Sequence, residues 1–129
     1  MAIATEQLFT NYANDYESDF YAWTQNQAQI LRDRQWQLID VEHLAEEIED
    51  MGRAEKRKLE SRLEVLLMHL LKWQFQDDNR SRSWQLTIKE QRLGLQRHLK
   101  QNPSLKTLVP EMLTKLLAKY CIVCDMAQN

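Results

Sequence analysis

An acidic cluster beside a histidine is the first feature of the sequence that suggests chemistry. Glu46, Glu47, Glu49 and Asp50 lie close together, and His43 precedes the first two by three and four positions. Residues at these spacings share one face of a helix, which suits metal ligands. Di-iron bundles, however, pair Glu-x-x-His motifs on two helices, and this chain contains no Glu-x-x-His. The favoured interpretation is a solvated acidic face, or ion-pair partners for basic residues elsewhere.

Polar residues also recur along the apolar middle of the chain. Glu55, Arg62 and His69 are spaced seven residues apart, a repeat that keeps side chains on one seam of a helix. Buried polar groups need partners, so a paired structural layer is favoured over a proton-sensitive element at His69. A metal-dependent helical-bundle enzyme is a further alternative, with four candidate ligands: His43, Glu46, Glu47 and His69.

A basic segment, Arg80-Ser81-Arg82-Ser83-Trp84, opens the helix that we expect over about residues 82–100. The free N–H groups of a helix N-terminus, beside arginines and hydroxyls, suit a phosphate or carboxylate. A nucleic-acid contact is therefore an alternative function, through Arg80, Arg82, Lys89, Arg92 and Arg97. We favour pairing of these bases with the acidic helix after Asp40, because acids interleave with the bases.

The two cysteines, Cys121 and Cys124, form a single C-x-x-C. A structural zinc site usually needs four ligands, and a thioredoxin-like motif needs an α/β pattern. We therefore expect no metal, no redox role and no cofactor. The sequence shows neither a signal peptide nor a run of about 20 apolar residues. A cytoplasmic protein without a membrane partner is the prediction.

The composition predicts the elements that must position these residues. Among 129 residues there are only two glycines and two prolines, and strong helix formers dominate. The fold class is predicted as all-α: a small antiparallel helical bundle with a long, bent central helix, in one domain over residues 1–129.

Caps and apolar spacing predict where these helices lie. An opening helix is expected after Thr5, and a second, capped by Asp15 or Ser18, runs to about Asp33. A short connection at 36–39 must pack down, and Asp40 caps the central helix. An apolar stripe begins that helix: Val41, Leu44, Ile48 and Met51. The helix is expected to continue with a bend at Gly52.

The later helices follow from two further breaks. Residues 77–79 separate the central helix from the next, which Ser81 or Asn79 caps and which returns antiparallel. Residues 102–104 end that helix, and Pro110 lies in the first turn of the last one. From Leu63 to Phe75 the central helix is apolar on nearly every side. This segment must be hidden from water, either inside the bundle or in a dimer interface.

Charge is unevenly divided along the chain. Residues 1–50 carry eleven acids and two bases, a net charge of −9, and the remainder carries fifteen bases and eight acids, a net charge of +7. Such halves can attract each other within one fold, or the basic half can meet nucleic acid. The internal pairing is the favoured interpretation.

Four groups of residues carry a family resemblance: 16–23, 44–52, 63–73, and 82–84 together with 87–88 and 91–92. They resemble a bacterial family called domain of unknown function, family twenty-nine, over about residues 12–108. The resemblance implies a small helical protein and no known activity. The last helix departs from the family pattern, and the cysteine pair lies outside it. If the family shares a binding site, the resemblance places it among six residues: Glu46, Glu47, His69, Arg82, Trp84 and Arg92.

The sequence as a whole favours an interaction module over an enzyme. The predicted function is a helical interaction or assembly module without catalytic apparatus. It is expected to self-associate through an apolar helix face, with a protein, itself or another, as its partner.

Overall fold

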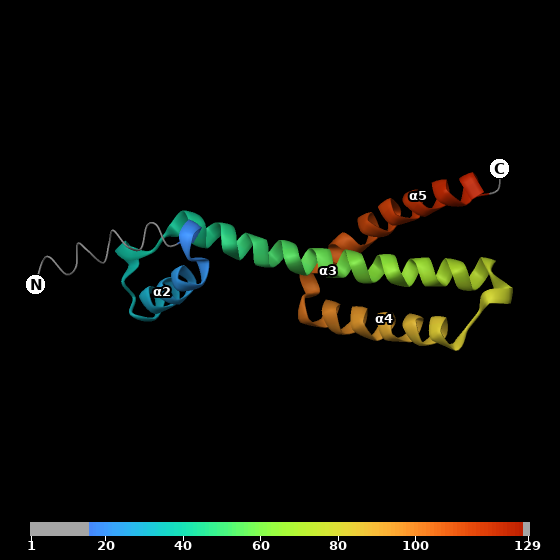
Figure 1. The fold of residues 1–129 in the computed structure, drawn as a ribbon, viewed down its shortest axis with the longest axis horizontal. Coiled ribbons are helices and arrows are strands. Elements are labelled where there is room, and N and C mark those ends of the chain that lie inside the picture. Colours follow the sequence, from blue (N-terminus) through green and yellow to red (C-terminus); the bar gives the residue numbers. More distant parts are fainter. Residues whose placement is uncertain (1–15, 128–129) are drawn as a thin grey trace, which may run out of the picture. The chain divides into compact units, whose positions relative to one another are not determined.

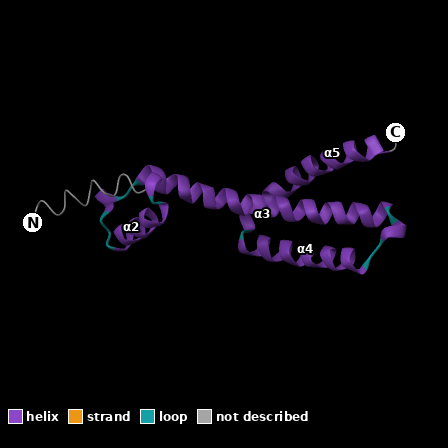
Figure 2. Ribbon diagram, viewed as in Figure 1, coloured by secondary structure: helices purple, strands orange, loops and turns teal. Residues whose placement is uncertain are grey.

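The computed structural model describes the backbone of residues 16–127 and the side-chain surroundings of residues 16–120. Within this range the chain consists of helices and connecting turns without a strand (Figure 2), which confirms the all-α prediction. The helix expected after Thr5 falls largely outside the described residues. Contacts divide the chain into a first unit ending at Gly52 and a second beginning at Arg53. A single domain over residues 1–129 stays a prediction.

The first unit contains helix α2, Phe20–Arg32, and the 3-10 turn η1, Trp36–Leu38. Asp19 caps α2 by accepting a hydrogen bond from the Ala22 amide at 3.0 Å, so the prediction that Ser18 caps this helix was wrong. The alternative cap, Asp15, lies outside the described residues. Trp23, Gln27 and Ile30 form the buried face of α2. Trp36 was expected to pack down, but it is 61% exposed.

Helix α3, Val41–Phe75, is a single element of 35 residues (Figure 1). Asp40 caps it as predicted, with Oδ1 accepting from the His43 amide at 3.4 Å. No glycine of the described residues has a positive φ, so Gly52 is an interior helical residue and not a left-handed cap. Continuity through Gly52 is confirmed, whereas a bend there stays a prediction.

The second unit adds two helices to the later part of α3. After the turn η2, Asp77–Asn79, helix α4 covers Arg82–Gln101 and returns antiparallel beside α3 (Figure 1). Ser81 caps it, accepting from the Trp84 amide at 3.2 Å. The turn η3, Pro103–Leu108, leads into α5, Val109–Ala127. The predicted breaks and the antiparallel return are confirmed.

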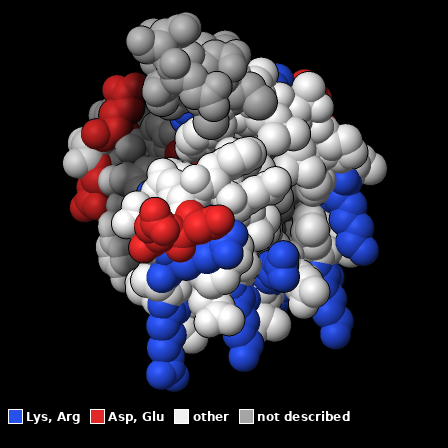
Figure 3. Space-filling view, turned by 90° about the vertical axis from the view of Figure 1, so that its right-hand side faces the viewer, with Lys and Arg blue, Asp and Glu red and all other residues white. Residues whose placement is uncertain are grey.

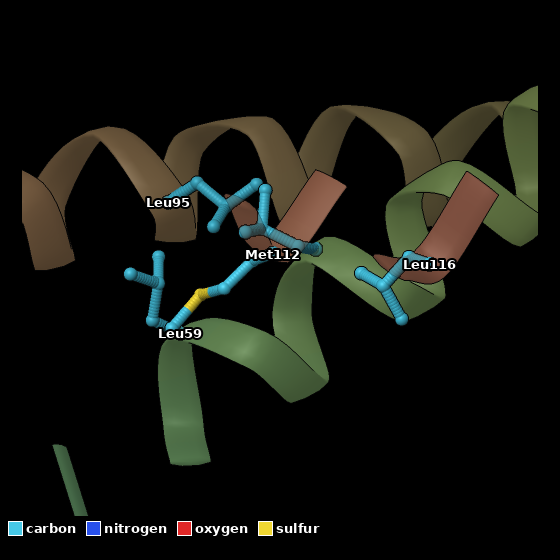
Figure 4. Packing of buried hydrophobic residues seen from close by; sticks show 5 residues of the cluster. Leu59, Leu95, Met112 and Leu116 are labelled. Carbon is cyan, nitrogen blue, oxygen red and sulfur yellow. The ribbon is translucent and has the colours of Figure 1, made fainter. Parts of the chain in front are cut away.

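The core of the second unit lies where α3, α4 and α5 meet. Figure 4 shows Leu59, Leu95, Met112 and Leu116 converging there, and Leu63 completes the buried cluster. Burial of each large apolar side chain contributes roughly 1.5–3 kcal/mol. The three helices are therefore held together by a small set of side chains.

The apolar segment Leu63–Phe75 is less covered than its sequence predicts. Leu63 is buried, the residues from 64 to 73 are half-buried, and Phe75 is 70% exposed. The expectation that the segment is hidden on all sides within the bundle was wrong. One antiparallel helix and the start of α5 shield only part of the circumference of α3.

Candidate functional site

A network around Asp40 joins α2 to the beginning of α3. The Asp40 carboxylate accepts hydrogen bonds from Trp23 Nε1 at 3.1 Å and from His43 Nδ1 at 2.7 Å. The backbone amide of Asp40 donates to the side-chain oxygen of Gln27 at 2.9 Å. Trp23 and Gln27 are each 2% exposed. Both of these buried side chains of α2 therefore form hydrogen bonds with Asp40, the residue that directly precedes α3.

Tyr16 covers the other side of the same histidine. Its ring stacks on His43 with 3.8 Å between the ring centroids, and its hydroxyl donates to Glu47 Oε1 at 2.7 Å. The hydrogen bond to Glu47, burial and the surrounding carboxylates raise the pKa of Tyr16 to about 12. Tyr16 therefore remains a neutral donor at physiological pH.

The Asp40–His43 contact also shifts both pKa values. Burial raises the pKa of Asp40, but hydrogen bonds from His43 and Trp23 outweigh burial and lower it overall. The hydrogen bond to Asp40 raises the pKa of His43. The carboxylate thus favours a protonated imidazole, and the pair fixes the ring against α2.

This network positions helices and offers no metal site. Among the described residues no three His, Cys, Asp or Glu side chains lie so that they could hold a metal ion. His43 binds Asp40 and Glu47 binds Tyr16, so two of the proposed ligands have protein partners. The metal-dependent alternative gains no support from the described part of the chain.

The six residues of the expected binding site divide between the two units. Glu46 is exposed in the first unit, and Glu47 lies there half-buried. The other four belong to the second unit: His69, Arg82, Trp84 and Arg92. A site that joins the glutamates to these four residues stays a prediction.

The four residues of the second unit have different surroundings. His69 Nδ1 lies 2.9 Å from the Val65 carbonyl oxygen and so donates to its own helix. The Lys72 ammonium lies 5.8 Å from the Trp84 ring centroid. Arg82 and Arg92 are exposed on α4. His69 and Trp84 thus make contacts within their own unit, whereas the side chains of Arg82 and Arg92 face solvent.

The predicted polar seam of α3 is paired across to α4 at two positions. His98 Nε2 lies 3.1 Å from the Glu55 carbonyl oxygen, and Arg62 donates to Gln91 at 3.5 Å. His98 is 8% exposed, and the sequence interpretation missed it. Its position three residues after the buried Leu95 could have placed it beside the apolar face of α4.

Of the bases proposed for nucleic acid, Arg80 is engaged within its own unit. Its Nε donates to the Trp73 carbonyl oxygen at 2.7 Å, and its guanidinium lies 2.6 Å from the Asp77 carboxylate. Arg82, Lys89, Arg92 and Arg97 are exposed on α4. Figure 3 shows several Lys and Arg side chains side by side along its lower edge. In Figure 1, α4 lies on this lower side of the second unit.

The apolar stripe at the beginning of α3 is open to solvent. Val41 is 65%, Ile48 60% and Met51 69% exposed, while Leu44 is half-buried. On the other flank of this helix, His43 and Glu47 contact Tyr16, and Trp23 of α2 contacts Asp40 and His43. Within the first unit, the described residues thus leave these three side chains of the stripe exposed.

A second uncovered surface lies on α4. Leu86 is 55% and Leu93 52% exposed, and they line a surface groove of about 600 Å³ with Arg82, Lys89 and Arg92. The two leucines are seven residues apart and therefore share one helix face. The groove combines apolar contact area with positive charge.

Comparisons with known proteins support the family resemblance. A family model described as "Domain of unknown function DUF29" matches residues 16–122. The match begins four residues later than expected and extends into α5 as far as Ile122, so most of the last helix and Cys121, which were expected to lie outside the family pattern, fall within it. No curated protein and no solved structure matches the chain. None of the described helices has the length and apolar character needed to cross a membrane.

Proposed function

The chain belongs to the DUF29 family, whose model spans most of its length, and we propose that it is a non-catalytic helical module that self-associates through uncovered apolar helix faces. The observation that carries this proposal is the exposed stripe Val41, Ile48 and Met51 on α3. Large apolar side chains at helical spacing are the usual anchors of a partner helix. Burial of three such side chains against a partner supplies several kcal/mol of favourable free energy.

The limited coverage of the later part of α3 supports the same function. Residues 64–73 are half-buried and Phe75 is exposed, although the sequence there is apolar on nearly every side. Contiguous apolar surface on a small protein is typical of interaction sites. The half-covered segment therefore favours the dimer-interface alternative.

Light scattering coupled to size exclusion tests this function. We expect the wild-type chain at micromolar concentration to have a mass larger than one chain. Replacement of Ile48 by Asp introduces a charge into the stripe, and its desolvation on association should shift the protein toward the monomer.

Tyr21→Asp provides the matched control for Ile48→Asp. Tyr21 is 73% exposed on α2, in the same unit but outside the stripe, so we expect this variant to associate like the wild type. A wild-type chain that stays monomeric up to about 100 μM, where a specific interface gives a measurable population of dimer, contradicts the proposed function.

A further inference from the structure

We propose that the open stripe of α3 in one copy docks on the basic, leucine-bearing face of α4 in a second copy. This inference rests on the proposed function and names the two surfaces that meet. The α3 surface consists of Val41, Ala45, Ile48 and Met51 with the flanking acid Glu42. The α4 surface consists of Leu86 and Leu93 with Arg82, Lys89 and Arg92.

The α3 surface combines an apolar arc with a negative edge. At about 100° per residue, the arc from Met51 through Ile48 to Ala45 spans roughly 120° of the helix. Glu49 and then Glu42 lie next along the circumference, and both of them and Glu46 are exposed. The opposite flank is closed by the contacts of His43 and Glu47 with Tyr16. A partner therefore meets the apolar arc and the acids together.

The α4 surface has the complementary arrangement. Leu86 and Leu93 repeat after seven residues, as Val41 and Ile48 do, so the two pairs of anchors have the same spacing of about 10 Å along their helices. Lys89 lies between the leucines on the helix face, and Arg82 and Arg92 line the same groove. Each apolar anchor pair can thus contact the other while opposite charges face each other across the rim.

The charge of the whole chain favours a second copy as the partner. Residues 1–50 carry a net charge of −9 and the remainder +7, so every copy brings one surface of each sign. Complementary charges accelerate association and select its register. Two exposed leucines within the basic face favour a protein over nucleic acid, because a phosphate backbone gains nothing from them.

A charge-swap experiment tests the pairing. Glu42→Lys and Lys89→Glu each place like charges across the contact, and we expect each variant alone to self-associate about five-fold more weakly than the wild type. In an equimolar mixture, Lys at position 42 of one chain meets Glu at position 89 of the other. We expect the mixture to regain affinity to within about two-fold of the wild type. Sedimentation velocity over a concentration series gives these dissociation constants.

Two further variants serve as controls. Glu60→Lys on α3 and Lys106→Glu in η3 make the same charge changes at exposed residues outside both surfaces, and they should associate like the wild type. Thermal unfolding of each variant checks that the fold is intact, and the mixture reports on the contact even where one variant is less stable.

The outcomes separate this pairing from the proposed function. Restored association in the mixture supports the pairing. A wild-type chain that associates while Glu42→Lys and Lys89→Glu leave it unchanged overturns the pairing and leaves self-association standing. A wild-type chain that is monomeric overturns both. Loss of association after nuclease treatment, or a salt-sensitive shift of a labelled single strand that Lys89→Glu abolishes, assigns the α4 face to nucleic acid and overturns the pairing.

Discussion

At the scale of single residues, Asp40 shows how one carboxylate can organise a helix junction. It caps α3, accepts from the Trp23 indole and holds the His43 ring, while its amide binds Gln27. A hydrogen bond to a charged group contributes more than one between neutral groups. Loss of this carboxylate would leave the buried Trp23 N–H without an acceptor. The start of α3, and with it the direction in which the stripe faces, therefore depends on this residue, whose carbonyl oxygen also accepts from the Leu44 amide at 3.0 Å.

The Asp40–His43 contact predicts a pH window for the stability of the first unit. The pKa of Asp40 is lowered from 3.8, so its contribution is present above pH 3.8 and is lost as the pH falls through the lowered value. The pKa of His43 is raised from 6.5, so its contribution is complete below pH 6.5 and is lost as the pH rises through the raised value. We expect the contact to contribute most between pH 3.8 and 6.5.

An NMR titration of the His43 ring measures this effect directly. The wild-type His43 should titrate above 6.5, and Asp40→Asn should bring its pKa back toward 6.5. In urea unfolding, His43→Gln should lose more stability at pH 5.5 than at pH 8.5. A His43 pKa at or below 6.5 in the wild type would refute the assigned contact.

At the scale of the helices, α3 shows what the sequence could and could not predict. The caps Asp40 and Ser81 and the break before α4 were predictable because each depends on neighbouring residues alone. The coverage of each apolar stripe was not, because it depends on where other helices pack. The stripe beginning at Val41 and the stripe containing Leu59 have similar spacing, yet Val41 is 65% and Leu59 0% exposed.

The candidate site was predictable to the same limited degree. The sequence pattern singled out His43 and Glu47 as candidate ligands. In the structure His43 pairs with Asp40 and Glu47 accepts from Tyr16, so both side chains make contacts within the protein. Tyr16 lies 31 positions before Glu47, so no local spacing connects them. Arg82 and Arg92 were also singled out, but the exposure of the neighbouring Leu86 and Leu93 depends on which face of α4 packs in the core, and local spacing does not determine that.

The two glycines provide a matched prediction about helix packing. A Cβ at Gly52 meets no atom within 4 Å, so Gly52→Ala should raise the free energy of unfolding by about 0.5–1 kcal/mol through helix propensity. A Cβ at Gly94 meets the Arg62 guanidinium, which donates to Gln91. Gly94→Ala should therefore show no net stabilisation, because displacement of Arg62 offsets the gain.

Urea unfolding of the two alanine variants compares these values directly. In Arg62→Ala the obstructing side chain is absent, and Gly94→Ala should then become stabilising in that background. Equal stabilisation by both glycine substitutions in the wild type would show that Arg62 is not held against α4 at Gly94.

At the scale of the whole molecule, the division of charge matters more than the net charge. The net charge of −2 at pH 7 predicts little repulsion between copies. In the proposed pairing, the opposite charges of the two halves, −9 and +7, attract the α3 surface of one copy to the α4 surface of another. When two copies make this contact reciprocally, they form a closed dimer. When each copy instead binds a further copy, the contact builds larger assemblies. The mass distribution in solution distinguishes these two forms.

Salt should separate the electrostatic part of this association from the apolar part. Between about 0.05 M and 0.5 M salt the screening length falls from roughly 14 Å to roughly 4 Å, so attraction between the Glu42 and Lys89 surfaces should weaken. We expect the dissociation constant measured by sedimentation to rise several-fold over this range. The Glu42→Lys variant, in which like charges face each other, should instead associate more tightly as salt is added. An association held by Val41, Ile48 and the leucines of α4 alone would respond identically in both proteins, so opposite salt responses identify the charged rim as part of the contact.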